Sequence, residues 1–534
     1  MTTAHTDLGV PALRPAATLA RYAAVPRTLP QTLAARVTAA GDRIFLVEGE
    51  REISYAAFAR QVSIGAAILA RLGVRSGDRV AVMGPTGIDL VRALFAIVRV
   101  GAIFVPVNPE LRAAEAGTIL SRAKPRLVLQ APELETVLDE ALAGSPVPRL
   151  DLGCALTGDA DAPGLEAEHP MPAPEDTCLV FFTSGTTGVP KGVMHAHRTF
   201  VVAGEGFVER QWIQPDDRML CILPMFHVNA LFYSLGGALA AGATLVLGGR
   251  FSASRFWPLV ASSGATQVNM LGSIGKILAL RPRAEFVPDH RLDRVYCVPM
   301  PADVQQVFRE TFGVRWIAEG YGMSEVPGIL AQPYGEAPRV GTMGRVCRHP
   351  DGRALGSLRV VDEAGRDVRP GEPGTLLVKT ELAMQGYFEA PEATAAAYVD
   401  AYFATGDRVR EAEPGLFAFV ARDKDMIRRR GENVAAAEID QAALACPDVA
   451  EAAAVAVPSE LGEDDILLAV VLRAGAALTA EVLHAFLRAR LAPAKVPRYV
   501  AIVADMPYGP TQRVLRYKLA QDSGLRALAQ DFGG

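Results

Sequence analysis

Short apolar runs rich in β-branched residues alternate with longer stretches of helical spacing from residue 44 onward, and this alternation constrains the fold most. Residues 79–83 (RVAVM) are typical of a strand, residues 87–100 carry apolar side chains at helical spacing, and residues 103–107 (IFVPV) are typical of a second strand. Strands separated by helices form βαβ units, whose strands lie parallel with helices on the faces of the sheet. We therefore predict an α/β fold with parallel-rich sheets flanked by helices.

Two changes of pattern divide the chain. Residues 357–380 consist of short strands with tight turns, which predicts a small β unit. After residue 425, helices and strands alternate over a tail of about 110 residues, which is long enough for an independent α+β domain. We therefore predict a flexible N-terminal arm over residues 1–28, a large N-terminal domain over residues 29–422 and a small C-terminal domain over residues 425–534.

Composition argues against several classes of protein. The 54 basic and 59 acidic residues give a formal net charge of −5, so we expect no broad cationic face that would neutralise a nucleic-acid backbone. The six cysteines form no CxxC pair and predict neither a zinc site nor a disulfide framework. The first residues lack the basic start and apolar run of a secretory signal. We therefore predict a cytoplasmic protein that binds no nucleic acid.

One stretch, residues 228–248, is apolar over about the length of a membrane span. Its many Gly and Ala residues, with Pro224 and His227 just before it, favour a tightly packed interior helix, turn and strand. We therefore expect residues 228–248 to lie in the protein interior. A membrane span is the alternative interpretation of this stretch.

A loop rich in Gly, Thr and Ser follows the strand-like residues 178–182. Its glycines permit backbone conformations that bring several amide N–H groups to one point, and its hydroxyls and Lys191 add further donors. Such a loop suits a polyphosphate. It is not a Walker A loop, because Pro190 stands where that motif needs its last glycine. The predicted nucleotide contacts in this loop are Thr183, Ser184, Gly185, Thr186, Thr187, Gly188 and Lys191.

Four further segments carry polar groups suited to a nucleotide or an acid: EGYGMSE (319–325), YFATGDR (402–408), ARDK (421–424) and PMFHVN (224–229). Together with the loop, they resemble the core motifs of the acyl-adenylate-forming superfamily, which includes acyl-CoA synthetases, firefly luciferase and the adenylation domains of peptide synthetases. The resemblance runs from about residue 29 to residue 519, and the chain most resembles the crotonobetaine/carnitine-CoA ligases.

The EGYGMSE segment resembles the motif that holds adenine and magnesium. The resemblance implies that the ring of Tyr321 lies on adenine, that Ser324 approaches phosphate and that Glu325 holds Mg²⁺. A carboxylate oxygen suits a hard cation, which screens the phosphate charge that would repel an anionic nucleophile. The same resemblance assigns Gly322 to the nucleotide and Gly320 to the acid pocket.

The resemblance extends to the ribose and to a hinge. It implies that Asp407 and Arg422 bind the ribose hydroxyls, for which a carboxylate is a suitable acceptor. Lys424 and Asp425 fall at the hinge about which the small domain rotates between an adenylation pose and a transfer pose. The PMFHVN segment resembles the border of the acid pocket, with Phe226, His227 and Asn229 as the implied lining residues.

The sequence departs from the superfamily pattern at two places around the acid. In residues 507–514 (PYGPTQRV), Arg513 takes the position of the lysine that usually bridges the substrate carboxylate and the α-phosphate. Arginine keeps the charge, but its planar fork is larger and donates in a different geometry. Residues 295–302 (VYCVPMPA) lack the usual Gly-Gly-Ala-Pro turn. These departures suggest an unusual and small acid.

We therefore expect ATP-dependent, AMP-forming activation of a small acid with release of pyrophosphate, followed by transfer to an acceptor, most commonly coenzyme A. The expected catalytic residues are Arg513, Lys191, Glu325 and His227, and the expected cofactor is Mg²⁺. A homodimer is a further expectation. Two alternatives remain open: a diazotase that activates nitrous acid for an aromatic amine, and a noncatalytic member that binds nucleotide.

Overall fold

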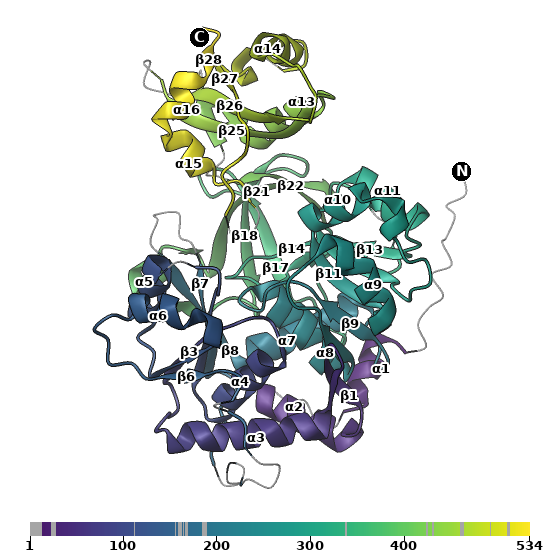
Figure 1. Cartoon of the computed structure of the whole chain (residues 1–534). Helices are drawn as coiled ribbons and strands as arrows, with labels where there is room; N and C mark the ends of the chain where they lie inside the picture. Colours follow the sequence, from purple (N-terminus) through teal and green to yellow (C-terminus); the bar gives the residue numbers. More distant parts are fainter. Residues whose placement is uncertain are drawn as a thin grey trace. The chain divides into compact units, whose positions relative to one another are not determined.

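The structure is a computed structural model that describes most of the chain, and Figure 1 labels its elements. The described residues are 13–22, 28–111, 113–154, 156–158, 163, 165, 169–183, 190–336, 339–422, 426–429, 432–459, 464–491, 493–509 and 513–533. The chain divides into two compact units. The first comprises Met1–Leu358 and Val378–Phe403, and the second comprises Arg359–Leu377 and Ala404–Gly534.

One seven-stranded sheet of the first unit has the order β13-β12-β11-β9-β10-β1-β2. Its strands are β1 (Ile44–Glu48), β2 (Arg51–Ser54), β9 (Arg218–Cys221), β10 (Thr244–Leu247), β11 (Gln267–Leu271), β12 (Arg294–Val298) and β13 (Trp316–Ala318). All neighbours pair in parallel except β1 and β2, which are antiparallel. The connecting helices are α9 (Ala253–Ser263), α10 (Gly272–Leu280) and α11 (Ala302–Glu310). Parallel strands require such crossovers, as the sequence predicted.

The other seven-stranded sheet has the order β19-β8-β7-β4-β3-β5-β6. Its strands are β3 (Arg79–Met83), β4 (Ile103–Val107), β5 (Leu127–Gln130), β6 (Arg149–Asp151), β7 (Thr177–Thr183), β8 (Lys191–Ala196) and β19 (Gly386–Tyr387). Strand β3 is parallel to β4 and β5, whereas β8 is antiparallel to β7 and β19. The helices between its first strands are α4 (Ile88–Arg99), α5 (Ala113–Ala123) and α6 (Glu135–Ala141). The predicted α/β fold is confirmed.

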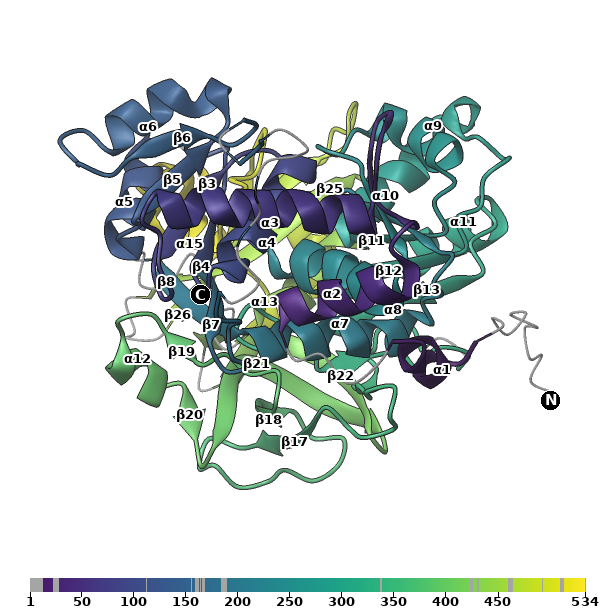
Figure 2. The same ribbon diagram turned by 90° about the horizontal axis from the view of Figure 1, so that it is seen from below.

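Helices fill the middle of the first unit, between strands of the two sheets (Figure 2). Helix α3 (Tyr55–Arg71) begins where the Ser54 side chain accepts a hydrogen bond from the backbone N–H of Ala57, an N-cap that satisfies an otherwise unpaired donor. Helix α7 (His197–Gln211) packs closely on α8 (Gly236–Ala241), because a Cβ added to Gly204 would lie only 2.5 Å from the Gly236 carbonyl oxygen. Glycine therefore sets the distance between these two helices.

The apolar stretch over residues 228–248 is part of this interior. It forms a π-helical segment, Asn229–Leu235, followed by α8 and then β10. Nearly all of its residues are buried. The predicted helix, turn and strand are confirmed, and no helix in the described part of the chain has the length and apolarity to cross a bilayer.

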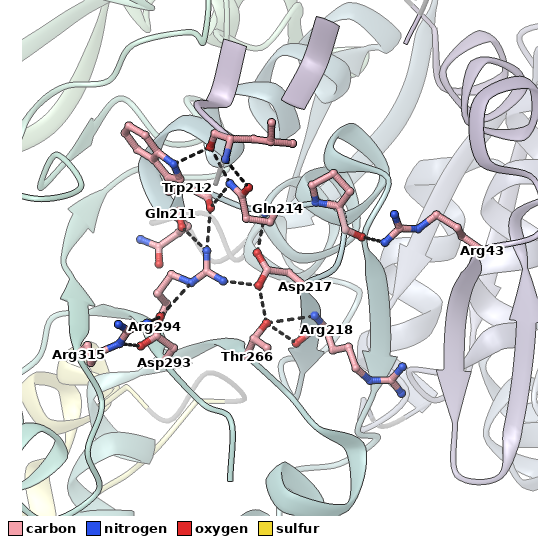
Figure 3. Close-up of polar contacts among 12 residues, drawn as sticks. Arg43, Gln211, Trp212, Gln214, Asp217, Arg218, Thr266, Asp293, Arg294 and Arg315 are labelled. Carbon is pink, nitrogen blue, oxygen red and sulfur yellow. Dashed lines mark hydrogen bonds and ion pairs between the residues drawn. The ribbon is translucent and has the colours of Figure 1, made fainter. Parts of the chain in front are cut away.

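A buried ion pair ties the end of α7 to the amino ends of three parallel strands (Figure 3). The Arg294 guanidinium pairs with Asp217 and donates hydrogen bonds of 3.1 and 2.8 Å to the carbonyls of Gln211 and Trp212. Asp217 also accepts a 2.8 Å hydrogen bond from the hydroxyl of Thr266. A cation at a helix C-terminus satisfies carbonyls that have no partner within the helix. The position of α7 is thereby fixed.

Part of the predicted N-terminal arm contacts the same region. Residues Pro15–Ala20 form the short helix α1. The Leu13 carbonyl accepts hydrogen bonds from the Trp212 indole at 2.8 Å and from the Gln214 amide at 3.0 Å. These contacts hold the described part of the arm against the first unit.

A further sheet has the order β17-β18-β21-β20, with β22 paired to β21. The bounds are β17 (Gly356–Val361), β18 (Gly374–Thr380), β20 (Tyr398–Val399), β21 (Tyr402–Glu413) and β22 (Leu416–Arg422). Strands β21 and β22 are antiparallel. Gly365 and Gly371 have φ of +76° and +90°, conformations that favour glycine, and they lie between the short strands of this unit.

The C-terminal part of the second unit is an α+β sandwich, as predicted. Its sheet has the order β25-β26-β27-β28, formed by Val449–Pro458, Asp464–Leu472, Tyr499–Ile502 and Gln530–Asp531. Strand β26 is buried on both faces. Its alternate residues Ile466, Leu468 and Val470 share a core with α13 (Ala436–Leu444) and α14 (Ala480–Arg488). Leu467 and Ala469, on the opposite face, share a core with α15 (Arg516–Gln521) and α16 (Ser523–Leu528), as the period of two in a strand requires.

Candidate active site

The predicted polyphosphate loop is a hairpin connection between β7 and β8. Thr183 ends β7, Lys191 begins β8, and the two residues lie opposite each other in the antiparallel register. Both are partly buried. Ser184, Gly185, Thr186, Thr187 and Gly188 lie outside the described residues. The two described ends of the loop are therefore adjacent, and they fix where the loop begins and ends.

A tyrosine links the end of this loop to the predicted magnesium carboxylate. The Nζ atom of Lys191 lies 4.9 Å from the ring centroid of Tyr387. The hydroxyl of Tyr387 donates a 2.9 Å hydrogen bond to Oε1 of Glu325. Burial, and then the nearby Glu325 carboxylate, raise the pKa of Tyr387, so its hydroxyl stays protonated and remains a donor. Lys191 and Glu325, predicted from separate motifs, thus both contact Tyr387.

The sequence analysis did not single out Tyr387. It lies on β19, a two-residue strand that pairs antiparallel with β8 so that Tyr387 is opposite Val193. The backbone N–H of Phe388 also donates a 2.7 Å hydrogen bond to the Gly192 carbonyl. A two-residue strand gives no periodic signal in the sequence, and only the pairing with β8 shows where its side chains lie.

The backbone around Glu325 is held from two sides. Its carbonyl accepts a 2.8 Å hydrogen bond from the N–H of Met384, three residues before Tyr387. The preceding carbonyl, that of Ser324, accepts a 2.6 Å hydrogen bond from Nε2 of His195. His195 is fully buried, and desolvation lowers its pKa to about 4, so the ring is neutral with its proton on Nε2. His195 therefore orients the segment as a neutral donor.

Both glycines of the EGYG sequence are required by close packing. Gly320 and Tyr321 form β14, which pairs antiparallel with β15 (Leu330–Ala331), and Tyr321 is buried. A Cβ added to Gly320 would lie 2.3 Å from the hydroxyl of Tyr296. A Cβ added to Gly322 would lie 2.4 Å from the backbone nitrogen of Gly328. No side chain fits at either position without moving the backbone or the tyrosine.

A second carboxyl group, that of Glu319, is buried at the start of this segment. Its Oε1 accepts a 2.7 Å hydrogen bond from Gln305, and its Oε2 accepts a 3.3 Å hydrogen bond from the N–H of Met300. Burial raises the pKa of Glu319 to about 7. The sequence analysis quoted Glu319 as the start of a motif but did not predict this environment. It links the segment to residues 298–300, where the usual glycine-rich turn is missing.

The predicted acid-pocket residues follow the carboxyl end of β9. The rings of Phe226 and His227 lie 4.5 Å apart, both partly buried. Asn229 accepts a 3.0 Å hydrogen bond through Oδ1 from the side chain of Asn269, which also donates to the hydroxyl of Ser234 at 3.0 Å. Asn269 is buried on β11, so this network orients Asn229 from within the core.

These segments share one edge of a parallel sheet. Strands β9, β12 and β13 end before residues 224–229, 299–300 and 319–325 respectively. In parallel sheets the carboxyl ends of neighbouring strands lie at the same edge, where ligands of α/β proteins usually bind. The first unit therefore brings the predicted acid-pocket residues and the EGYGMSE segment to the edge at which a ligand is expected.

The remaining predicted site residues belong to the second unit. Asp407 is fully buried on β21, its N–H donates a 3.1 Å hydrogen bond to the Thr405 hydroxyl, and it lies opposite Arg422 in the register of β21 and β22. The side chain of Arg422, and Lys424 and Asp425 entirely, lie outside the described residues. Arg513 is exposed, and its carbonyl accepts a 2.8 Å hydrogen bond from the N–H of Gly509.

Comparisons with known proteins identify the family of the chain. The model of the AMP-binding enzyme family matches residues 33–388, and that of the AMP-binding enzyme C-terminal domain matches residues 438–511. The chain is 32% identical to the sulfoacetate–CoA ligase of Cupriavidus necator over 92% of this chain and 97% of that protein. It is 29% identical to the crotonobetaine/carnitine–CoA ligase of Salmonella arizonae over 88% of this chain and 93% of that protein.

Solved structures give the same result. The structure of ATP-bound MatB from Rhodopseudomonas palustris superposes with a TM-score of 0.83 at 25% identity, and the match covers 92% of this chain and 98% of that one. The family models together cover most of the chain. This chain belongs to the AMP-binding enzyme family.

Proposed function

We propose that this chain is an ATP-dependent, AMP-forming acid–CoA ligase. The observation that carries the proposal is the contact of Lys191 and Glu325 with the same tyrosine, Tyr387, which brings the end of the polyphosphate loop beside the predicted metal carboxylate. The relatives reported above are named for the ligation of an acid to coenzyme A, and they give the diazotase alternative no support.

The first unit offers groups suited to the triphosphate of ATP. The loop that starts at Thr183 and ends at Lys191 would bind phosphate through its amides, its hydroxyls and the Lys191 ammonium. Tyr321 would stack on adenine, and Gly322 and Ser324 would lie along the nucleotide. These roles remain proposals that rest on the family motifs and on the adjacency of the segments.

A magnesium ion fits this arrangement only if the nucleotide supplies most of its ligands. Among the described residues, no group of three or more His, Cys, Asp and Glu side chains could hold a metal ion. Mg²⁺ commonly takes one or two carboxylates together with substrate phosphates and water. Glu325, whose Oε1 accepts from Tyr387 and whose Oε2 is a further acceptor, would hold it. The ion would neutralise phosphate charge there.

The first chemical step is adenylation. A carboxylate oxygen of the acid attacks the α-phosphorus of ATP, the new P–O bond forms, and the bond to pyrophosphate breaks. Lys191 would offset negative charge on the departing pyrophosphate, and Arg513 would offset it between the carboxylate and the α-phosphate. Phe226, His227, Asn229 and Gly320 would line the space for the acid. The product is an acyl-adenylate.

The second step is transfer to coenzyme A. The sulfur attacks the acyl carbon, a C–S bond forms, the C–O bond to AMP breaks, and the thiol proton passes to solvent. We propose that Asp407 and Arg422 bind the ribose hydroxyls. We also propose that Lys424 and Asp425 form the hinge of a mobile small domain, so that residues 29–422 and 425–534 move as two parts. A homodimer and a cytoplasmic location remain predictions, and light scattering on the purified protein tests the former.

The experiment that tests the proposal follows both steps. Purified protein is incubated with ATP, Mg²⁺ and a panel of short acids, with and without coenzyme A, and AMP, pyrophosphate and thioester are quantified. The proposal requires AMP and pyrophosphate that depend on one or more of the acids, and a thioester only when coenzyme A is present. Nucleotide binding with no AMP from any acid would instead support the noncatalytic alternative.

A further inference from the structure

Helix α7 carries a buried cation with an incomplete set of partners. Arg210, one residue before the end of the helix, is only 3% exposed. Its Nε donates a 3.1 Å hydrogen bond to the carbonyl of Gly206 in the same helix. Both terminal nitrogens, Nη1 and Nη2, are buried, and among the described residues they face the hydroxyls of Tyr233 and Tyr296 and no carboxylate. The end of the side chain that would normally pair with an anion therefore has no counter-charge in the part of the chain that the structure describes.

The neighbours of this guanidinium supply no negative charge. Its Cζ atom lies 5.0 Å from the ring centroid of Tyr233 and 5.6 Å from that of Phe207. Burial raises the pKa of Tyr233 to about 12 and also raises the pKa of Cys347, so both groups are neutral at physiological pH. The buried carboxylate on the same helix, Glu205, is engaged by His349 at 3.0 Å.

A buried charge without a counter-charge is costly. Moving an ionised side chain into a protein interior costs several kcal/mol unless an opposite charge and hydrogen bonds compensate it. Contacts with aromatic rings return roughly 0.5–2 kcal/mol. Among the described residues no carboxylate forms an ion pair with Arg210, so a bound ligand is the natural source of the missing anion.

Arg210 packs against residues 322–328, which follow β13. A Cβ added to Gly328 would lie 2.2 Å from its Nη1. The backbone nitrogen of Gly328 in turn lies 2.4 Å from the Cβ position of Gly322. A side chain at either glycine would therefore displace the guanidinium or the backbone that covers it. The cation thus lies against the same segment that carries Glu325.

Two tyrosines join Arg210 to Gly320 of the predicted acid pocket and to Gly322 of the predicted nucleotide site. The hydroxyl of Tyr233 lies 3.0 Å from the Cβ position of Gly322, and the hydroxyl of Tyr296 lies 2.3 Å from that of Gly320. The three rings of Phe207, Tyr233 and Tyr296 pack on one another with centroids 5.3 to 5.8 Å apart. Tyr233 stands on the π-helical segment that begins at Asn229, and such segments are frequent at functional sites.

The position of Arg210 is fixed rather than adjustable. The next two residues, Gln211 and Trp212, have their carbonyls bound by the buried Arg294, as Figure 3 shows. Trp212 has a φ of 50°, and its N–H donates to the carbonyl of Val208, which ends the helix. With this backbone held and its Nε bound to the Gly206 carbonyl, the Arg210 guanidinium is preorganised for a ligand, because little side-chain entropy remains to be lost on binding.

We propose that Arg210, with the hydroxyls of Tyr233 and Tyr296, binds a second anionic group of the acid, at the end opposite the carboxylate that is adenylated. The substrate class is then short acids with a sulfonate or a second carboxylate, groups that a guanidinium binds through two parallel hydrogen bonds. This inference rests on the proposed acid–CoA ligase activity.

Matched pairs of acids test the inference. Sulfoacetate is compared with methylsulfonylacetate, and malonate with its monoamide, because the members of each pair differ mainly in the distal charge. For each acid, kcat/KM is measured by acid-dependent pyrophosphate release. The wild-type protein is expected to prefer the charged member of at least one pair by about 100-fold or more, as expected for a buried charged site left unpaired by the neutral analogue.

The variant Arg210→Met should reduce this preference to within about 10-fold, mainly by lowering kcat/KM for the charged acid. Arg210→Lys keeps the charge but loses the paired donors, so its preference for the charged acid should lie between those of the wild type and Arg210→Met. This variant also serves as the test if Arg210→Met does not fold. Arg36→Met is the matched control, since Arg36 is also buried but donates to the carbonyls of Leu239 and Ala240. It should leave the preference unchanged.

The outcomes separate the two claims. AMP formation with monoanionic acids alone, or an equal preference within each pair, overturns the inference and leaves the ligase proposal standing. A wild-type preference that Arg210→Met and Arg210→Lys both retain also overturns it. Absence of AMP with every acid overturns the ligase proposal, and the inference falls with it.

Discussion

The hydroxyl of Tyr387 donates a 2.9 Å hydrogen bond to Oε1 of Glu325. Lys191 contacts the same tyrosine, because its ammonium nitrogen lies 4.9 Å from the centroid of the Tyr387 ring. Tyr387 thereby connects β19 with the hairpin that carries the predicted polyphosphate loop and with the segment that carries Glu325, the predicted metal carboxylate. We expect its hydroxyl to act as a positioning group for Glu325.

Substitution of Tyr387 by Phe removes this hydrogen bond and keeps the ring beside Lys191. A hydrogen bond to a charged group contributes about 1.5–3 kcal/mol, so kcat/KM for ATP should fall by about 10-fold or more. The Mg²⁺ concentration for half-maximal rate should rise, which a purely structural role would not produce. Tyr22→Phe, which loses a 2.8 Å bond to the Ala241 carbonyl, is the control. An unchanged Mg²⁺ requirement in Tyr387→Phe would show that the Tyr387 hydroxyl does not position Glu325.

Replacement of the Glu325 carboxylate should have a larger effect. Glu325→Gln keeps the shape but removes the charge that would hold Mg²⁺, so acid-dependent pyrophosphate release should fall by about 100-fold or more, in the range seen for loss of one electrostatic group in an active site. Glu389→Gln, an exposed carboxylate paired with Lys124, should keep wild-type activity. If Glu325→Gln remained as active as the control, the metal role of Glu325 would be wrong.

The buried Glu319 should make the stability of the protein depend on pH. Its folded-state pKa is raised to about 7, so between the unfolded value of 4.5 and about 7 the folded state holds a proton that the unfolded state releases. The stabilisation is fully present below pH 4.5 and is lost as the pH rises through 7. Glu319→Gln lacks this titration and should be less sensitive to pH. Thermal unfolding of both proteins at pH 5 and pH 8 checks this: the Tm difference, variant minus wild type, should be more positive at pH 8.

Arg513 is expected to act in adenylation and not in thioester formation. Arg513→Ala should lower acid-dependent pyrophosphate release by about 100-fold, because the charge between the carboxylate and the α-phosphate is lost. The conversion of a supplied acyl-adenylate to the thioester should remain within a few-fold. Lys518→Ala removes an exposed cation nearby in the sequence and serves as the control. Equal losses in both half-reactions would contradict a specific role in the first.

The sequence predicted the elements whose signal is local. The strands over residues 79–83 and 103–107 and the helix between them follow from periodicity alone, and the parallel pairing follows from the crossover length. Motif resemblance then placed Lys191 and Glu325. The contact between them through Tyr387 could not be predicted, because it depends on the pairing of a two-residue strand with β8.

Burial was the second feature that the sequence could not reveal. Glu319 and Arg210 look like ordinary charged residues, one before a glycine and one near the end of a helix. Their properties arise from what packs around them: Gln305 and the backbone of Met300 around Glu319, and the rings of Phe207 and Tyr233 around Arg210. The fold determines these environments, and no periodic pattern reports them.

The central claim is tested most directly by the products of one complete reaction. The protein is incubated with ATP, Mg²⁺, coenzyme A and each short acid of the matched panel, and nucleotides, pyrophosphate and thioester are measured together. The account predicts that at least one acid gives AMP, pyrophosphate and acyl-CoA in equal amounts, with AMP absent when the acid is omitted. ADP and orthophosphate as products, or AMP formation that no acid stimulates, would contradict it.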